Sequence, residues 1–140
     1  MTGTVRDWMT RNPTTVGPDD SVETVRQLVE QNTFHHLLVV EHARLIGVIS
    51  DRDRLRNLSP FIGRAMAERQ QDVAPLRRVH QIMTRSPVAA PPDLPVGQTA
   101  ALLLERGVSC LPIVTGAQRP LGILKWKDPL RAMLDTTVAS

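Results

Sequence analysis

The sequence predicts a mixed α/β (α+β) fold of two units, each in the order β-α-β-β-α, with the sheets of the two units packed together. Three observations predict this class. The chain contains a long internal repeat, each repeat alternates short apolar runs with amphipathic stretches, and 41% of the 140 residues are hydrophobic. That composition supports a packed core. One half alone would bury too little apolar surface to be stable, so we expect the halves to share their packing.

The internal repeat is the strongest signal in the sequence. Residues 5–13 return as residues 79–87, and at this offset residues 5–40 are identical to their counterparts at 11 of 36 positions. Chance would give about two or three identities. After one inserted residue, Gly47-Val48-Ile49 aligns with Gly122-Ile123-Leu124. The chain is therefore interpreted as a tandem duplication.

The duplication predicts the domain boundaries. We expect one domain over residues 5–58, a second over residues 79–135, and a linker over residues 59–78. The linker carries a short apolar stripe followed by polar residues, which predicts a helix over residues 61–72 that ends before Pro75.

The first repeat shows the periodicities of both secondary structures. Val22 and Val25 lie on one helical stripe, and Asp20 or Ser21 offers the N-cap of that helix. The run from Leu37 to Val40 is apolar throughout and bounded by polar residues, as in a buried strand. The predicted elements are an extended stretch at 13–18, a helix at 21–32, strands at 37–40 and 45–50, and a helix at 51–58 that stops before Pro60.

The second repeat follows the same order. Gly107 marks the end of its first helix, because glycine readily adopts the left-handed conformation of a helix C-terminus. The predicted elements are a helix at 96–106, strands at 110–114 and 121–125, and a closing helix at 126–134.

Charge and composition exclude several classes of protein. The net charge is only +3, and the bases Arg52, Arg54, Arg56, Arg64, Arg69, Arg77 and Arg78 are spread among acidic neighbours. A nucleic-acid partner is therefore not favoured. The single Cys110 excludes an intrachain disulfide framework. The chain has no apolar run near 18 residues and no signal-peptide pattern, so we expect a soluble cytoplasmic protein with no membrane partner.

Two motifs carry a family resemblance. Each repeat opens with Met-Thr-x-x-Pro, at Met9–Pro13 and Met83–Pro87, and a strand of the first repeat ends in Gly-x-x-Ser-x-x-Asp, at Gly47–Asp53. In this order and duplication the chain resembles a stand-alone pair of CBS domains, also called a Bateman module. The resemblance implies units related by a pseudo-twofold axis, two clefts that bind adenosine-containing ligands, and homodimerisation.

The first cleft can also be argued from its residues. Ser50 and Asp53 place a hydroxyl and a carboxylate at one helix N-terminus, where a carboxylate could accept hydrogen bonds from ribose hydroxyls. Arg52 and Arg54 beside that N-terminus suit a phosphate. A plain N-cap is the alternative interpretation of the same spacing. With the resemblance, the expected cleft residues are Thr14, Thr15, Val16, His35, His36, Leu37, Ser50, Arg52 and Asp53.

The second cleft departs from this pattern. Lys125 stands where the hydroxyl residue would be, while Asp128 keeps the position of the carboxylate. Lys125 either pairs with Asp128 and closes the site or reaches a phosphate, and we favour lost or altered nucleoside binding. The expected residues of this weaker cleft are Val88, Ala89, Cys110, Leu111, Pro112, Lys125 and Asp128.

Other reactive side chains suggest no chemistry. The chain's four histidines lack the spacing of metal ligands, and Cys110 has no histidine base beside it in the sequence. We therefore expect no metal site and no catalytic residue. His35 or His36 instead falls where the resemblance implies an adenine pocket.

The preferred hypothesis is a regulatory module, not an enzyme, that binds an adenosine nucleotide and signals to an unknown protein partner by a population shift. AMP, ADP, ATP, NAD and S-adenosylmethionine all remain open as ligands. The alternatives are a ligand-free interaction module and, less favoured, a nucleic-acid binder. A homodimer is expected because two helical stripes are more apolar than one small module should leave exposed. Those stripes are Val22, Val25, Leu28 and Val29, and Leu102, Leu103 and Leu104.

Overall fold

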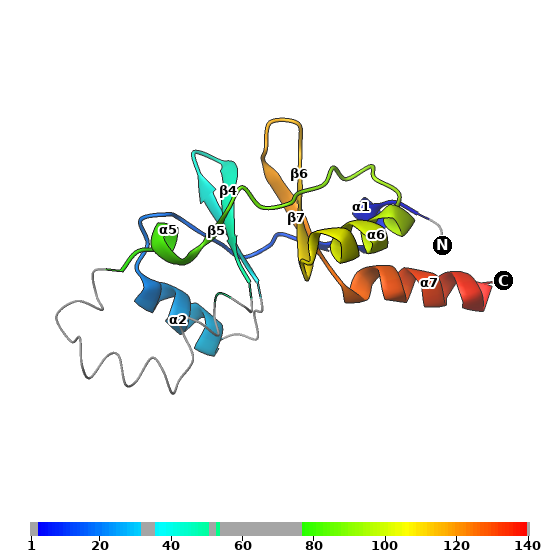
Figure 1. Ribbon diagram of the computed structural model, residues 1–140, viewed down its shortest axis with the longest axis horizontal. Helices are drawn as coiled ribbons and strands as arrows, with labels where there is room; N and C mark the ends of the chain where they lie inside the picture. Colours follow the sequence, from blue (N-terminus) through cyan, green and yellow to red (C-terminus); the bar gives the residue numbers. More distant parts are fainter. Residues whose placement is uncertain (1–2, 32–35, 51–52, 54–76, 140) are drawn as a thin grey trace. The chain divides into compact units, whose positions relative to one another are not determined.

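The computed structural model describes residues 3–31, 36–50, 53 and 77–139. It confirms the mixed α/β class, and its elements fall into two compact units. We call residues Thr14–His42 and Ile46–Ser86 the first-repeat unit. The second-repeat unit consists of Met1–Pro13, Ala43–Leu45 and Pro87–Ser140. Each unit thus contains a segment from the other repeat (Figure 1).

The first-repeat unit is built on a sheet of four strands in the order β2-β3-β4-β5. Strand β2 runs parallel to β3, with Thr15 opposite Leu38, while β5 is antiparallel to β4, with Thr84 opposite Val48. The strands are β2 (Thr15–Val16), β3 (Leu37–Glu41), β4 (Arg44–Ile49) and β5 (Thr84–Arg85), and the helices are α2 (Val22–Gln31) and α5 (Val79–Ile82).

The second-repeat unit has a sheet of three strands in the order β1-β7-β6. An isolated parallel bridge between Ala90 and Ile113 stands where β2 pairs with β3 in the other unit. The strands are β1 (Thr10–Arg11), β6 (Cys110–Val114) and β7 (Pro120–Lys125), and the helices are α1 (Val5–Trp8), α6 (Val96–Arg106) and α7 (Lys127–Ala139).

Most described elements confirm the sequence predictions. Helix α6 and strand β6 have the predicted bounds, and Gly107 ends α6 in the left-handed conformation, with φ of 63°. Helix α7 begins one residue later than predicted and continues to Ala139. Of the helix predicted at 51–58, only Asp53 is described, and it is helical. The predicted linker helix at 61–72 lies outside the described residues.

Each unit has its own aliphatic core, and the two cores contain the helical stripes noted in the sequence. In the first-repeat unit Val22 and Val25 are buried, and Leu28 and Val29 pack against the same cluster. In the second, Leu103 is buried and Leu102 packs against the core. The prediction that a second copy of the chain is needed to cover these stripes was therefore wrong, except at Leu104, which is 84% exposed. Their apolar faces are covered within each unit.

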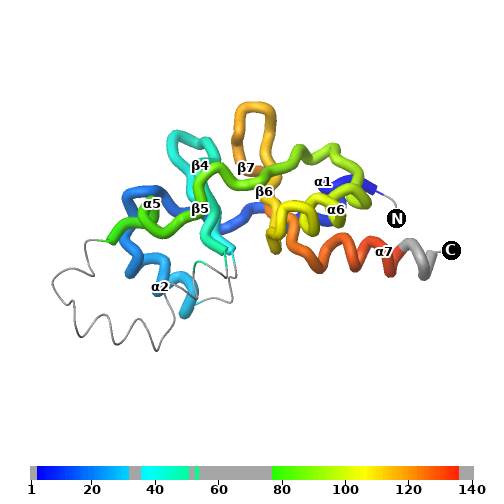
Figure 2. The backbone as a smooth tube through the Cα atoms, in the orientation of Figure 1, coloured from blue at the N-terminus to red at the C-terminus, as the bar shows by residue number. Residues whose placement is uncertain are grey.

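The repeats exchange their opening segments, which we define as residues 3–13 and 77–86. The N–H of Val5 donates to the carbonyl of Leu94 at 2.9 Å, inside the second repeat. The matching bond in the other unit runs from Val79 to Asp20, also at 2.9 Å. Val5 and Val79 are both fully buried. Figure 2 shows the consequence for the second-repeat unit, where α1 lies beside α6.

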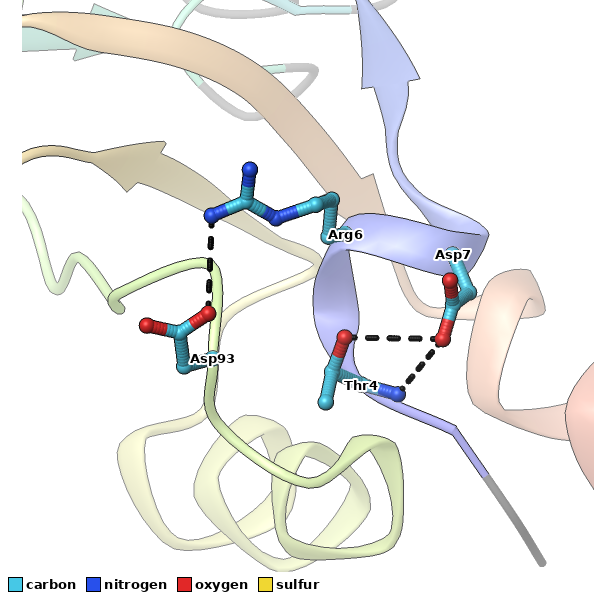
Figure 3. Close-up of polar contacts among 4 residues, drawn as sticks. All are labelled: Thr4, Arg6, Asp7 and Asp93. Atoms are coloured by element: carbon cyan, nitrogen blue, oxygen red, sulfur yellow. Dashed lines mark hydrogen bonds and ion pairs between the residues drawn. The ribbon is translucent and has the colours of Figure 1, made fainter.

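Side chains assist this docking at the first opening segment (Figure 3). The Asp7 carboxylate accepts a hydrogen bond from the Thr4 N–H at 2.9 Å and thereby caps α1. The Arg6 guanidinium reaches Asp93, in the segment before α6, at 3.4 Å. Both members of this ion pair are largely exposed, so the backbone bonds and the buried Val5 provide most of the stabilisation.

Two glycines allow the exchanged strands to approach closely. A Cβ atom at Gly47 would lie 2.6 Å from the Met83 sulfur and 3.0 Å from the Thr84 carbonyl oxygen. A Cβ atom at Gly122 would lie 2.6 Å from the Thr10 carbonyl oxygen. These glycines are thus required by the strands that pass over them, β5 and β1.

Among the described residues, none of the helices combines the length and hydropathy that crossing a membrane requires.

We predict that Gly122→Ala destabilises the fold, because the new methyl group meets a backbone oxygen that belongs to a paired strand and cannot rotate away. The expected loss in the free energy of unfolding is about 1–3 kcal/mol, measured by urea denaturation. Gly116→Ala is the matched control, since a Cβ atom there would meet nothing within 4 Å. Equal stability of the two variants would contradict the close approach.

Candidate functional site

Asp53 is the centre of a cluster of hydroxyl groups in the first-repeat unit. Its side chain is buried, with the residue 8% exposed. Oδ2 of the carboxylate accepts hydrogen bonds from the Ser50 N–H at 2.9 Å, the Ser50 Oγ at 3.1 Å and the Thr84 Oγ1 at 3.2 Å. The Thr84 Oγ1 is also 3.4 Å from Oδ1.

The local fold explains why these groups meet. Ser50 directly follows β4, so its position is set by a strand whose end, Ile49, is fully buried. Thr84 comes from the opening segment of the second repeat, on β5, which pairs with β4 one residue from Gly47. Because Gly47 has no side chain, β5 can lie close enough for the Thr84 hydroxyl to reach Asp53. The Gly-x-x-Ser-x-x-Asp motif therefore includes the residue that admits β5.

The cluster can act both as a helix cap and as a ligand site. The Ser50 N–H donates a hydrogen bond to the Asp53 carboxylate, three residues further on, and this bond is one half of a capping box. The contact expected from the N-cap interpretation is therefore present. The same contacts orient the carboxylate toward a vicinal diol, whose hydrogen bonds to a carboxylate would be stronger than bonds between neutral groups. The two roles use the same atoms.

The equivalent carboxylate in the second-repeat unit has different partners. Asp128 is 3% exposed, and its Oδ2 accepts a hydrogen bond from the Lys125 N–H at 2.8 Å. Its Oδ1 lies 3.4 Å from the Arg131 guanidinium. The cation paired with Asp128 is thus Arg131, one turn along α7, and Lys125 contributes its backbone. Both carboxylates thus accept the matching backbone bond, but the side-chain partners are hydroxyls at Asp53 and a guanidinium at Asp128.

The other residues predicted for the first cleft are spread between core and surface. The Thr14 carbonyl accepts a hydrogen bond from the Leu38 N–H at 3.1 Å. Thr15 is exposed, His36 is half-buried directly before β3, and Val16 and Leu37 belong to the aliphatic core. His35 and Arg52 lie outside the described residues.

The residues predicted for the second cleft are mostly apolar and buried. Leu111 belongs to the core, and Cys110 and Pro112 are buried beside it on β6. Val88 packs against the same core, while Ala89 is half-buried. Apart from Asp128, only the half-buried Lys125 brings a charge to this set.

Sequence reasoning missed Thr84 and Arg131. Thr84 belongs to the repeated Met-Thr-x-x-Pro opening, but that motif was assigned to the second repeat, and nothing in a single repeat signals the exchange. Arg131 could have been found, because it lies three residues after Asp128 on a predicted helix, at the spacing of helical ion pairs. Within the part of the chain that the structure describes, no three His, Cys, Asp or Glu side chains are grouped as a metal site.

These features define a class of protein: a tandem pair of α/β units with exchanged openings and a buried carboxylate after the last strand of each repeat. The family model named CBS domain matches residues 5–60 and 79–135. The chain therefore belongs to the CBS domain family and carries two copies of the domain.

Two curated relatives illustrate the contexts in which this pair occurs. A CBS domain-containing protein of Dictyostelium discoideum is 29% identical over 132 residues, which cover 93% of this chain and 90% of the relative. The L-aspartate semialdehyde sulfurtransferase of Methanocaldococcus jannaschii is 28% identical over 125 residues. That match covers 89% of this chain but only 22% of the enzyme, so this chain spans about a fifth of it.

Solved structures share the fold along the whole chain. The CBS-pair protein CBSX2 from Arabidopsis thaliana has a TM-score of 0.81 and 27% identity, and the match covers 100% of both chains. A structure of CBSX2 in complex with AMP has a TM-score of 0.78 and 28% identity, covering 96% of this chain and 98% of that one. The CBS domain pair of protein MJ0100, solved with 5-methylthioadenosine and S-adenosyl-L-methionine, has a TM-score of 0.75 at 24% identity, covering 97% and 99% of the chains.

Proposed function

We propose that this chain is a regulatory module that binds an adenosine-containing ligand at Asp53 and passes the binding event to a protein partner. The observation that carries the proposal is the hydroxyl–carboxylate cluster of Ser50, Asp53 and Thr84 at the end of β4. Its support from outside the chain is the likeness to CBSX2, a protein whose structure has been determined with AMP.

Asp53 is the proposed recognition group for the ribose. Its carboxylate accepts hydrogen bonds from the two vicinal ribose hydroxyls, while the Ser50 N–H keeps the carboxylate oriented. Arg52 and Arg54 follow Ser50 in sequence and are the proposed phosphate contacts. AMP is the first ligand to test because of the CBSX2 complex, and ADP, ATP, NAD and S-adenosylmethionine complete the panel.

The second site is proposed as the weaker one. A ligand diol at Asp128 competes with Arg131, which already forms an ion pair with that carboxylate at 3.4 Å. Lys125 also supplies no hydroxyl where Ser50 does. The two sites of the module are therefore inequivalent in the proposed function.

A homodimer is the second part of the proposal, and α7 with Trp126, the residue before it, supplies the surface. Trp126, Leu130, Met133 and Leu134 lie at helical spacings of four, seven and eight residues, on one face, and are 46–61% exposed. Such a stripe is self-complementary when two copies meet across a twofold axis. We propose a second copy of this chain as its occupant. This surface also serves the alternative function, in which the protein is a ligand-free interaction module.

We predict that Asp53→Ala weakens AMP binding at least about tenfold, because losing a charge-assisted hydrogen bond costs roughly 1.5–3 kcal/mol. Asp128→Ala, the matched variant in the other repeat, should have a smaller effect. Isothermal titration calorimetry measures both affinities, with circular dichroism as the control for folding. Loss of binding in Asp128→Ala together with normal binding in Asp53→Ala would contradict the proposal and place the working site in the second repeat.

We predict that Leu130→Glu together with Leu134→Glu converts the protein to a monomer, because the added charges would have to be desolvated in the interface. Light scattering at micromolar concentration should show the mass of a dimer for the native chain and half of it for the double variant. Leu104→Glu is the control, since Leu104 is exposed on α6, outside the stripe. A native chain of monomeric mass would exclude the homodimer.

A further inference from the structure

Thr84 occupies the position that ligand hydroxyls would need at Asp53. Its Oγ1 lies 3.2 Å from Oδ2 and 3.4 Å from Oδ1, so one hydroxyl faces both oxygens of the carboxylate. Oδ2 also accepts both bonds from Ser50. The three described donors already exceed the two lone pairs of this oxygen, so a ligand hydroxyl can bind it only where a donor leaves. A diol that binds both oxygens must therefore displace a donor.

Among these described donors, Thr84 is the one least constrained by its surroundings. The Ser50 N–H is fixed by the backbone at the end of β4, and the Ser50 hydroxyl belongs to the same half-buried residue. Thr84 is exposed and lies on the two-residue strand β5. Rotation about its Cα–Cβ bond, or a small shift of β5, removes its hydroxyl from the carboxylate.

We propose, on the basis of the function proposed above, that Thr84 is a latch: its hydroxyl holds Asp53 when the site is empty, and a ribose diol binds by displacing it. The latch residue lies close in sequence to the point where the chain passes from one unit to the other. Thr84 belongs to the second repeat, and the chain leaves the first-repeat unit for the other at Pro87, three residues further on. Ligand binding thus releases a side-chain anchor three residues before that crossing.

The second-repeat unit provides an internal comparison. Thr10 lies opposite Ile123 on β1, in the same register as Thr84 opposite Val48. Both Thr10 and Asp128 are described, and no hydrogen bond joins them; Asp128 instead contacts Arg131 and the Lys125 N–H. The repeated threonine therefore has a partner at the site that keeps its serine and none at the site that lost it.

The test compares AMP binding by the full-length native chain and by Thr84→Val, Thr84→Ser and Thr10→Val, using titration calorimetry. Valine keeps the shape and the strand propensity of threonine but removes the donor. Thr84→Val should bind AMP about threefold to tenfold more tightly, since the ligand no longer displaces a net favourable hydrogen bond. Thr84→Ser should bind like the native chain, and Thr10→Val should stay within about twofold of it.

Hydrogen exchange adds a readout that a purely structural role for Thr84 would not change. Saturating AMP should lower the protection of the amides at residues 84–86 in the native chain and leave it unaltered in Thr84→Val. AMP binding that is equally strong or weaker in Thr84→Val overturns the latch and leaves the proposed function standing. If neither the native chain nor any variant binds AMP or another member of the panel, the proposed function itself fails.

Discussion

The fold depends on the backbone contact between each opening segment and the repeat to which that segment does not belong. Val5 and Val79, buried in opposite units, are held by matching hydrogen bonds to Leu94 and Asp20. The sheets and the carboxylate site of the first-repeat unit both depend on this docking. The short strands β1 and β5 complete the sheets. The residues beneath them, Gly122 and Gly47, have no side chain and so allow the strands to approach. Of the two threonines on these strands, Thr84 reaches a carboxylate, that of Asp53.

The exchange also explains why the same motif produces unlike sites. Both repeats keep a carboxylate after their last strand and a threonine on the incoming strand, but only the first keeps the serine. In the second, Asp128 contacts Arg131 and the Lys125 backbone, and no hydrogen bond joins it to the threonine. The change from Ser50 to Lys125 at the strand end is therefore accompanied by different side-chain partners for the two equivalent carboxylates, Asp53 and Asp128.

Sequence reasoning predicted the elements that carry a periodicity and missed those that do not. Helix α6 and strand β6 follow from apolar patterns over five residues or more, whereas β1 and β5 have two residues each and no pattern to detect. Ser50 and Asp53 could be paired because they are local, but Thr84 is 31 residues from Asp53 and enters through the exchange. The apolar stripe of α2 correctly predicted a buried helix face. The pattern alone cannot distinguish burial within the unit, as observed for Val25, from burial against a second copy of the chain.

The reciprocal docking has a consequence for the origin of the chain. A protein with a single copy of the repeat would have no foreign opening segment and would have to borrow one from a second molecule, so the ancestral unit is expected to have been an obligate pair of identical chains. Joining two copies in one gene replaces that encounter by an intramolecular one, whose effective concentration no longer depends on expression level. Fusion also allowed the two copies to diverge independently, which a symmetric pair cannot do, and Ser50 and Lys125 record that divergence.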